Sequence, residues 1–388
     1  MIASSFDGLH MNLQRLCSNR TRLVLRCMPL DDHRGRDMAV VIAKLTWAVA
    51  LDGSATIAAS QAPVRLFDEP VTPDDPWSSL RYASDIVGEK PGTDVLLVGD
   101  AYPPADRGAT VQEVSLRVEA GDRTVQKSVR VHGERLFVKS MLGVAPGPAA
   151  PFKLPVPLIY ERSFGGRDES DPAAILVEPR NPAGLGVARD RERLVGTRVP
   201  EIEDPRAPIG SRSPVPAGFA PLPTHWAPRA ARYGTPDARW QKERMPIAPI
   251  DFDLRHNCCA PDDLHCASPL RGDEPVEIRG AVPEGIFRFQ LPRYAPVFKA
   301  VIRGLVSDLA THLDTFLVDL SNPSARRVEL TWRAAVPIPR KSEHLEKIYL
   351  LDEGEPLPEA PKEDPSLEAW LEEMSARATD GPMMEERS

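Results

Sequence analysis

The chain has 388 residues, long enough to bury two or three domains' worth of core, and 42% of them are hydrophobic. Its net charge of −8 resides in the tail, because the residues from Leu351 to the end include 12 acidic and 3 basic side chains. The body keeps 44 of the 56 acidic and 45 of the 48 basic residues and carries no basic stripe, so the composition excludes a nucleic-acid-binding protein.

No stretch of the sequence is suited to crossing a membrane. The most apolar run, Met38–Leu51, has 14 residues and contains Lys44, which is too short a span for a bilayer. The first residues lack the basic region followed by an apolar region that is typical of a secretory signal. Five cysteines, an odd number in a large chain, do not indicate a disulfide framework. We therefore expect a cytoplasmic protein without a membrane partner.

Residues 1–140 predict an N-terminal β-rich half with mainly antiparallel sheets. Asp52-Gly53 stands between two β-type runs and predicts a hairpin, and Val129–Val138 predicts another with Gly133 near its turn. The remaining expected strands alternate polar and apolar residues or form short apolar runs: Arg22–Cys27 at a sheet edge, Met38–Ala50, Pro91–Asp100, Val111–Val118 and Thr124–Val131.

The middle of the chain, residues 141–270, is rich in proline. Met141–Asp253 alone holds 19 of the 41 prolines, which excludes both a long helix and a central strand. Disordered segments are poor in aromatic residues, whereas this one contains Tyr160, Phe164, Phe219, Trp226, Tyr233 and Trp240. We predict an ordered, irregular segment that wraps the sheets and fastens the two halves of the chain together.

Short strands separated by turns resume in residues 271–341, which predict a C-terminal β-rich half packed with the first as one unit. The expected strands are Val276–Arg279, Ile286–Leu291, Phe298–Arg303, Thr315–Leu320 and Arg327–Ala335. Taken together, the sequence predicts a mainly β protein, with antiparallel β-sandwich-like sheets wrapped by the proline-rich segment.

Residues 342–388 form an acidic tail, in which Ser342–Leu351 is expected to be a short helix. Pro365–Ala378 predicts an amphipathic helix, because apolar residues recur there at helical spacing. These residues are Leu367, Trp370, Leu371 and Met374. The helix is expected either to pack on its own body or to enter a groove of a partner, and the sequence leaves both open.

Motifs for catalysis and nucleotide binding are missing from the sequence. Neither the nucleophile elbow G-x-S-x-G nor the phosphate-binding loop G-x-x-x-x-G-K-[ST] occurs. Gly184-Leu185-Gly186 begins a dinucleotide fingerprint, but Arg189 occupies the last glycine position. We therefore expect no cofactor.

One stretch, HNCCAPDDLHC, carries residue types that bind zinc: His256, Cys258, Cys259, His265 and Cys266. Adjacent cysteines rarely both bind one tetrahedral ion, and no C-x-x-C pair occurs here. Buried free thiols in a loop are the favoured interpretation, and whether these residues bind a metal stays open.

Acidic residues in the proline-rich segment allow an alternative function. Glycosidases use two carboxylates about 5–10 Å apart, and Glu161, Glu203 and Asp204 lie near aromatic residues in the sequence. A sugar-active hydrolase, or a carbohydrate-binding β-sandwich without catalysis, is the alternative hypothesis. Pairing of these carboxylates with arginines would count against the hydrolase.

Several blocks of sequence, in this order, resemble a bacterial family of domains of unknown function, whose members are encoded beside PAAR-like spike-tip proteins and toxins of the type VI secretion system. The resemblance covers about Val40 to Pro292 and rests on VVIAKLTWAVALDG, PGTDVLLVGDAY, VRVHGERLF, PLIYERSFGG, RNPAGLGV, PEIEDP, PAGFAPLPTHWAPR, ARWQKERMPIAPIDFD, NCCAPDD and LRGDEPVEIRG.

This resemblance implies a cytoplasmic adaptor or chaperone rather than an enzyme. Such a protein would bind a toxin effector or its PAAR-like carrier and assist its loading on the secretion spike. The resemblance brings no catalytic residues with it. Since several blocks fall in irregular backbone, we expect the partner to bind the aromatic residues there or the tail: Tyr160, Phe164, Phe219, Trp226, Tyr233, Trp240, Trp370 and Leu371.

Overall fold

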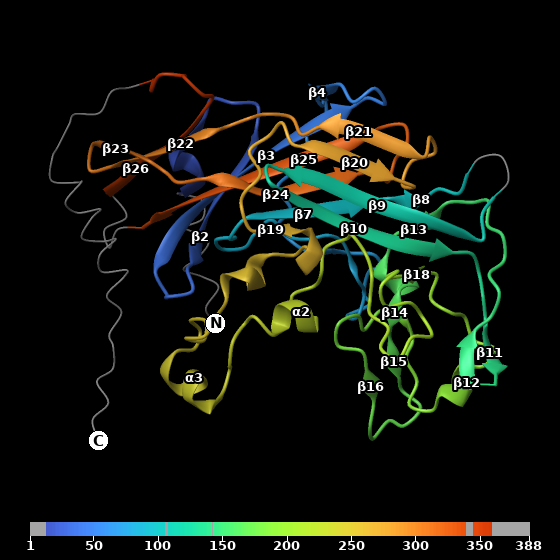
Figure 1. Ribbon diagram of the computed structural model, residues 1–388. Helices are drawn as coiled ribbons and strands as arrows, with labels where there is room; N and C mark the ends of the chain where they lie inside the picture. The colour runs from blue at the N-terminus through green and yellow to red at the C-terminus, as the bar shows by residue number, and fades with distance from the viewer. Residues whose placement is uncertain (1–12, 105–107, 142, 339–343, 359–388) are drawn as a thin grey trace.

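The computed structural model describes residues 13–104, 108–141, 143–338 and 344–358. Its regular structure is mainly β, as predicted, and most strand pairs are antiparallel. The two large sheets lie side by side in Figure 1, with the proline-rich segment below them. Apolar residues of both sheets, such as Leu116, Phe316 and Leu330, belong to one core.

The seven-stranded sheet joins strands from the N-terminal and C-terminal β-rich halves of the chain. β3 (Asp37–Val49) lies between β25 (Arg327–Pro337) and the edge strand β2 (Val24–Asp31). Its turn at Asp52-Gly53 leads to β4 (Ala55–Ile57) in the predicted hairpin, where Gly53 has a φ of +86°. The other strands are β24 (His312–Asp319), β7 (Thr93–Val98) and β19 (His265–Cys266), and β7 and β24 run parallel.

The five-stranded sheet is built around a long hairpin. Its strands follow the order β18 (Ile202–Glu203), β10 (Arg123–His132), β9 (Val111–Ala120), β20 (Pro275–Arg279) and β21 (Ile286–Gln290). The expected hairpin at Gly133 is wrong, because β11 (Phe137–Ser140) pairs with β12 (Gly143–Pro146) instead of β10. A Cβ on Gly133 would lie 1.9 Å from the carbonyl oxygen of Ala150, so this glycine serves a close backbone contact.

A four-stranded sheet contains the first and the last strand of the described chain. Its order is β1 (Cys17–Asn19), β26 (Leu345–Leu351), β22 (Val297–Ile302) and β23 (Leu305–Asp308). The expected helix at Ser342–Leu351 is therefore wrong. Residues 345–351 pair with β22 on one side and β1 on the other, and this pairing overrides local helix propensity.

The proline-rich segment has no long helix and no central strand among its described residues. Its two α-helices are α2 (Ala227–Ala230) and α3 (Ala238–Glu243). Its short strands are β13 (Val156–Pro157), β14 (Phe164–Gly165), β15 (Arg167–Asp168), β16 (Leu176–Val177) and β17 (Leu185–Gly186). Four 3-10 turns accompany them: η1 (Tyr160–Arg162), η2 (Arg191–Leu194), η3 (Leu254–Asn257) and η4 (Asp262–Leu264). Three short strands precede it, β5 (Glu69–Pro70), β6 (Leu80–Tyr82) and β8 (Asp100–Ala101).

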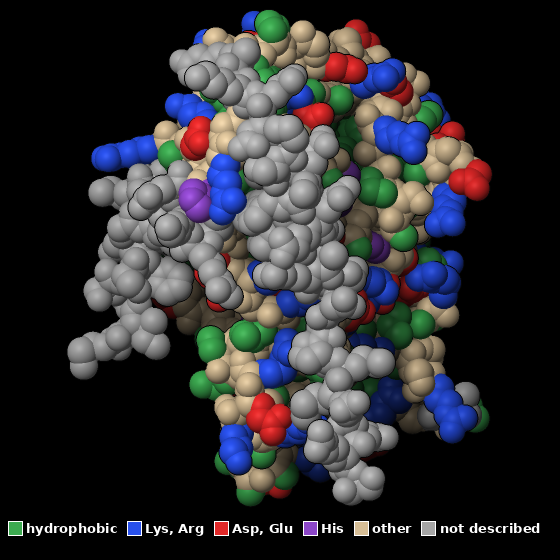
Figure 2. All heavy atoms as spheres, turned by 90° about the vertical axis from the view of Figure 1, so that its left-hand side faces the viewer, with side chains coloured by type: hydrophobic (Ala, Val, Ile, Leu, Met, Phe, Trp, Pro, Cys, Tyr) green, Lys and Arg blue, Asp and Glu red, His purple; other side chains and the backbone are tan. Residues whose placement is uncertain are grey.

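Among the described residues no helix is long and apolar enough to cross a membrane. Basic and acidic side chains alternate over the described part of the face shown in Figure 2 and do not gather into a basic stripe. The predicted helix at Pro365–Ala378, with Trp370 and Leu371, lies outside the described residues.

Candidate functional site

The second face of the seven-stranded sheet is charged and buried. Alternation along β25 directs Leu330 and Trp332 into the apolar core, which leaves Glu329 and Arg333 on the opposite face. β3 adds Lys44 to the same face, 1% exposed. The loops before β7 and the proline-rich segment cover this face, so these residues do not meet solvent as alternation alone would predict.

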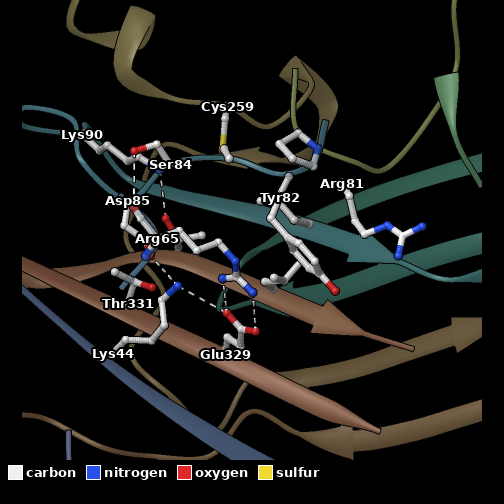
Figure 3. A pocket seen from close by; sticks show the side chains of 15 residues that line it. Lys44, Arg65, Arg81, Tyr82, Ser84, Asp85, Lys90, Cys259, Glu329 and Thr331 are labelled. Atoms are coloured by element: carbon white, nitrogen blue, oxygen red, sulfur yellow. Dashed lines mark hydrogen bonds and ion pairs between the residues drawn. The ribbon is translucent and has the colours of Figure 1, made fainter. Parts of the chain in front are cut away.

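An ion-pair network joins the side chains on this face. Lys44 donates a hydrogen bond to Asp85 at 2.6 Å and lies 3.4 Å from a carboxylate oxygen of Glu329. Arg65 donates to both oxygens of Glu329, at 2.5 and 2.9 Å. In Figure 3 the side chains of Lys44 and Arg65 converge on this carboxylate. Burial raises the pKa of Glu329, but the hydrogen bonds from Arg65 and the charge of Lys44 outweigh burial and hold it below its usual value.

The network extends along the sheet through two further pairs. Lys90 donates to Asp94 at 2.9 Å, and Arg333 donates to Asp314 at 2.8 Å. Burial alone would raise the pKa of Asp94, but Lys90 and hydrogen bonds from His265 and the Cys259 amide lower it instead. Each of these four cations, Lys44, Arg65, Lys90 and Arg333, thus has a carboxylate partner. The space left between the side chains is about 20 Å³, room for about one water molecule, so the network is a packed structural element.

A surface groove of about 280 Å³ opens above this network. Ser84, Lys90 and Cys259 line both the groove and the enclosed space beneath it. Phe67 and Leu66 form an apolar rim, and these residues are 79% and 40% exposed. The remaining lining residues are Asp68, Ala83, Ile86, Val87, Thr224, Arg229 and Asn257.

Arg229 is the unusual member of the groove. It is 2% exposed, and it donates from Nε to the carbonyl of His256 and from Nη1 to that of Leu222. Among the described residues no carboxylate forms an ion pair with it, and no hydrogen bond occupies Nη2. A buried cation without a counter-ion is costly, so this side of the groove favours an anionic ligand group.

The cysteine- and histidine-rich stretch divides between several contacts. His256 bonds the carbonyl of Arg229, and Cys266 donates to that of Ser268. Within the described chain, Cys258, His265 and Asp94 form a group whose ligand atoms lie within 4.8 Å of one another. Asp94 already accepts from Lys90 and the Cys259 amide, so its charge is neutralised without a metal. Burial raises the pKa of Cys259 to about 12, and thiols of this kind are inert.

The carboxylates considered for glycoside hydrolysis are held in structural contacts. Glu161 accepts from the backbone and hydroxyl of Ser79. Glu203 pairs with His132 at 2.7 Å and with Arg135 at 3.1 Å. Asp204 pairs with Arg206 at 2.8 Å, and Arg162 pairs with Glu201. This pairing counts against the hydrolase alternative.

The aromatic residues expected to meet a partner differ in exposure. Tyr160 and Trp226 are buried against each other, with ring centroids 5.4 Å apart, and Phe219 is buried in the main core. The side chains of these three residues therefore pack inside the protein and offer no surface to a partner in this structure. Phe164 is partly buried against the cluster around Phe137. Tyr233 and Trp240 are also partly buried and form an edge-to-face pair.

The irregular backbone of the proline-rich segment requires particular residues at some positions. Asn181 is fully buried and donates to the carbonyls of Tyr160 and Phe164. A Cβ on Gly165 would lie 2.2 Å from the Asn181 carbonyl oxygen. The blocks YERSFGG and RNPAGLG thus interlock, and packing accounts for them without a partner.

Sequence reasoning missed the groove residues Phe67 and Arg229. Arg229 belongs to the block PAGFAPLPTHWAPR, and Asn257 and Cys259 belong to NCCAPDD, so two blocks quoted for the family resemblance meet in this groove. Phe67 carries no signal of its own in the sequence, since a single apolar residue in a loop is ordinary.

Residues 34–333 match the model of a family described as an uncharacterized protein conserved in bacteria, DUF2169. No curated protein matches the chain, and no solved structure matches it.

Proposed function

The chain belongs to this family of uncharacterized bacterial proteins, and on that premise we propose that it is a cytoplasmic adaptor that binds a protein client. The client is a toxin effector of the type VI secretion system or its PAAR-like spike-tip carrier, and the adaptor assists its loading on the secretion spike. The sequence blocks described above support this proposal through the family they resemble.

The observation that carries the proposal is the chemistry of the groove. It joins an exposed phenyl ring at Phe67 to a buried guanidinium at Arg229 that lacks an acidic partner. Exposed aromatic side chains beside desolvated arginine are typical of protein-recognition sites. The neighbouring titratable groups Lys90, Asp94 and Glu329 are held in ion pairs, which suits binding better than proton transfer.

A rigid frame beneath the groove favours recognition of a folded or extended client. Pro221 and Cys259 cover the ion-pair network from the proline-rich segment, and proline fixes backbone conformation before binding. A surface that is ordered in advance loses less conformational entropy when it binds.

Co-expression with the PAAR-like protein or toxin encoded beside the chain tests this function. The tagged full-length protein is expected to capture that product, and Phe67→Ser is expected to reduce the capture. Leu154→Ser is the matched control, since Leu154 is also 79% exposed but does not line the groove. Failure of the wild-type protein to capture either product from its own gene neighbourhood would reject the proposal.

A further inference from the structure

A second groove, with a volume of about 690 Å³, is larger than the one above the ion-pair network. It lies where the turn between β9 and β10 meets the loops that precede β20, β22 and β24. We call it the loop groove, and the lining residues that matter below are Asp122, Arg271, Tyr294, His312 and Trp332. It shares no lining residue with the groove of Phe67 and Arg229.

Tyr294 and Trp332 bring two aromatic rings to the loop groove, with ring centroids 5.6 Å apart. Tyr294 is partly buried and donates its hydroxyl proton to Asp352, which holds its ring in place. Trp332 is 4% exposed, and among the described residues no acceptor bonds its indole N–H. Buried indole N–H groups usually have a hydrogen-bond partner, so this donor favours a ligand with a carbonyl oxygen.

His312 supplies an acceptor in the same groove. Its Nε2 lies 3.0 Å from the carbonyl oxygen of Lys90, and because a carbonyl oxygen can only accept, Nε2 carries the proton. In the neutral ring Nδ1 is then an acceptor, and it has no partner in the described part of the chain. Trp332 and His312 thus offer a donor and an acceptor beside aromatic surface, which suits a peptide unit with its own C=O and N–H.

Two charged side chains of opposite sign also line the loop groove without partners. Arg271 and Asp122 are exposed, and neither side chain forms an ion pair or a hydrogen bond with another described residue. Glu274 accepts from the backbone amides of Arg271 and Gly272, at 2.7 and 2.8 Å, and so fixes the turn that presents Arg271. A ligand with an acidic group at Arg271 and a basic group at Asp122 would complement both charges.

We propose that the loop groove binds an extended peptide segment of a protein partner, in which an apolar side chain stands between a basic and an acidic residue. The apolar side chain packs on Tyr294, and a peptide carbonyl accepts from Trp332. The acidic and basic residues pair with Arg271 and Asp122. This site is independent of the proposed adaptor function, because that function rests on the groove of Phe67 and Arg229.

Isothermal titration calorimetry of the full-length protein with blocked synthetic pentapeptides tests the proposal. The peptides KGFGE and EGFGK carry the expected pattern in the two chain directions, and QGFGQ lacks both charges. We expect one of the two charged peptides to bind with a Kd at least about tenfold lower than that of QGFGQ.

Variants of the protein separate the charged contact from the hydrogen bond. Arg271→Gln is expected to raise the Kd of the better charged peptide about tenfold and to leave that of QGFGQ unchanged. Arg212→Gln is the matched control and should change neither, since Arg212 is also exposed and without a described partner but does not line the loop groove. Trp332→Phe keeps an aromatic ring and removes the N–H donor, so it should weaken all three peptides alike. Circular dichroism and the melting temperature show that each variant is folded.

Three outcomes would overturn the proposal. Neither charged peptide could bind more tightly than QGFGQ. Arg271→Gln could behave like Arg212→Gln, which would leave the guanidinium without a role. N-acetylphenylalaninamide could bind as tightly as the better pentapeptide, which would assign the loop groove to a small molecule instead of a peptide.

Discussion

The buried ion-pair network makes a stability prediction that the substitution Glu329→Gln tests. Glu329 is 3% exposed, accepts two hydrogen bonds from Arg65 and lies 3.4 Å from Lys44. Loss of its charge leaves two buried cations, Lys44 and Arg65, with Asp85 as the remaining buried carboxylate partner. Breaking a buried pair in this way costs about 3–5 kcal/mol. We expect the free energy of unfolding at pH 7 to fall by about 3 kcal/mol or more.

A matched substitution provides the control. Glu277 also pairs with two arginines, Arg279 and Arg288, but on the surface of the five-stranded sheet. Exposed pairs contribute about 0–1 kcal/mol, so Glu277→Gln is expected to change stability by less than 1 kcal/mol. Urea unfolding followed by circular dichroism measures both. Equal decreases in the free energy of unfolding of the two variants would refute the reasoning, because burial of the ion pairs would then make no difference to their contribution.

The lowered pKa of Glu329 predicts that stability depends differently on pH in the wild-type protein and in Glu329→Gln. The folded-state pKa of Glu329 lies below its usual value. Its stabilisation is therefore complete above the unfolded pKa, about 4.3, and is lost as pH falls toward the folded value. We expect the wild-type protein to lose stability below about pH 5 more steeply than Glu329→Gln. Parallel curves for the two proteins over this range would contradict the assignment.

Further predictions follow from other contacts. Gly165→Ala should lower the free energy of unfolding by about 3 kcal/mol or more, because its Cβ would meet the Asn181 carbonyl oxygen at 2.2 Å. Gly285→Ala is the control and should cost about 1 kcal/mol, because Gly285 has a φ of +84° but open space around it. Equal melting temperatures of the two variants would contradict this. Iodoacetamide at pH 8 should label Cys259 far more slowly than the partly exposed Cys17, because burial raises the pKa of Cys259 to about 12. Equal labelling of the two cysteines by mass spectrometry would show that reagent reaches Cys259. Dialysis against a chelator should leave the melting temperature unchanged, because Lys90 neutralises Asp94; a fall would assign a metal to the group around Cys258.

The strands with strong alternation or β-branched runs could be predicted from the sequence. Asp52-Gly53 marks its hairpin because the turn itself requires a positive φ. Leu345–Leu351 could not be predicted, since its strand depends on pairing with residues far away in the sequence. Gly133 was misread because a glycine needed for close approach to Ala150 looks, in a sequence, like a glycine needed for a turn.

The groove was not predicted from the sequence, and none of the aromatic residues expected to meet a partner lines it. Its arginine and cysteine belong to blocks that the sequence singles out, but nothing in the sequence shows that Arg229 lacks an acidic partner. The charged residues Lys44 and Glu329 look like the solvent-facing side of two strands. They are buried because the loops before β7 and the proline-rich segment cover them, which depends on tertiary structure.

The most direct test of the proposed adaptor function is the affinity of the purified chain for a purified PAAR-like protein or toxin from its own gene neighbourhood. Isothermal titration calorimetry should give the same Kd for the wild-type protein and Leu154→Ser, and a Kd about tenfold higher for Phe67→Ser. Absence of binding by the wild-type protein to either product would contradict the adaptor function. Equal affinities for wild type and Phe67→Ser would keep the function but remove the groove from it.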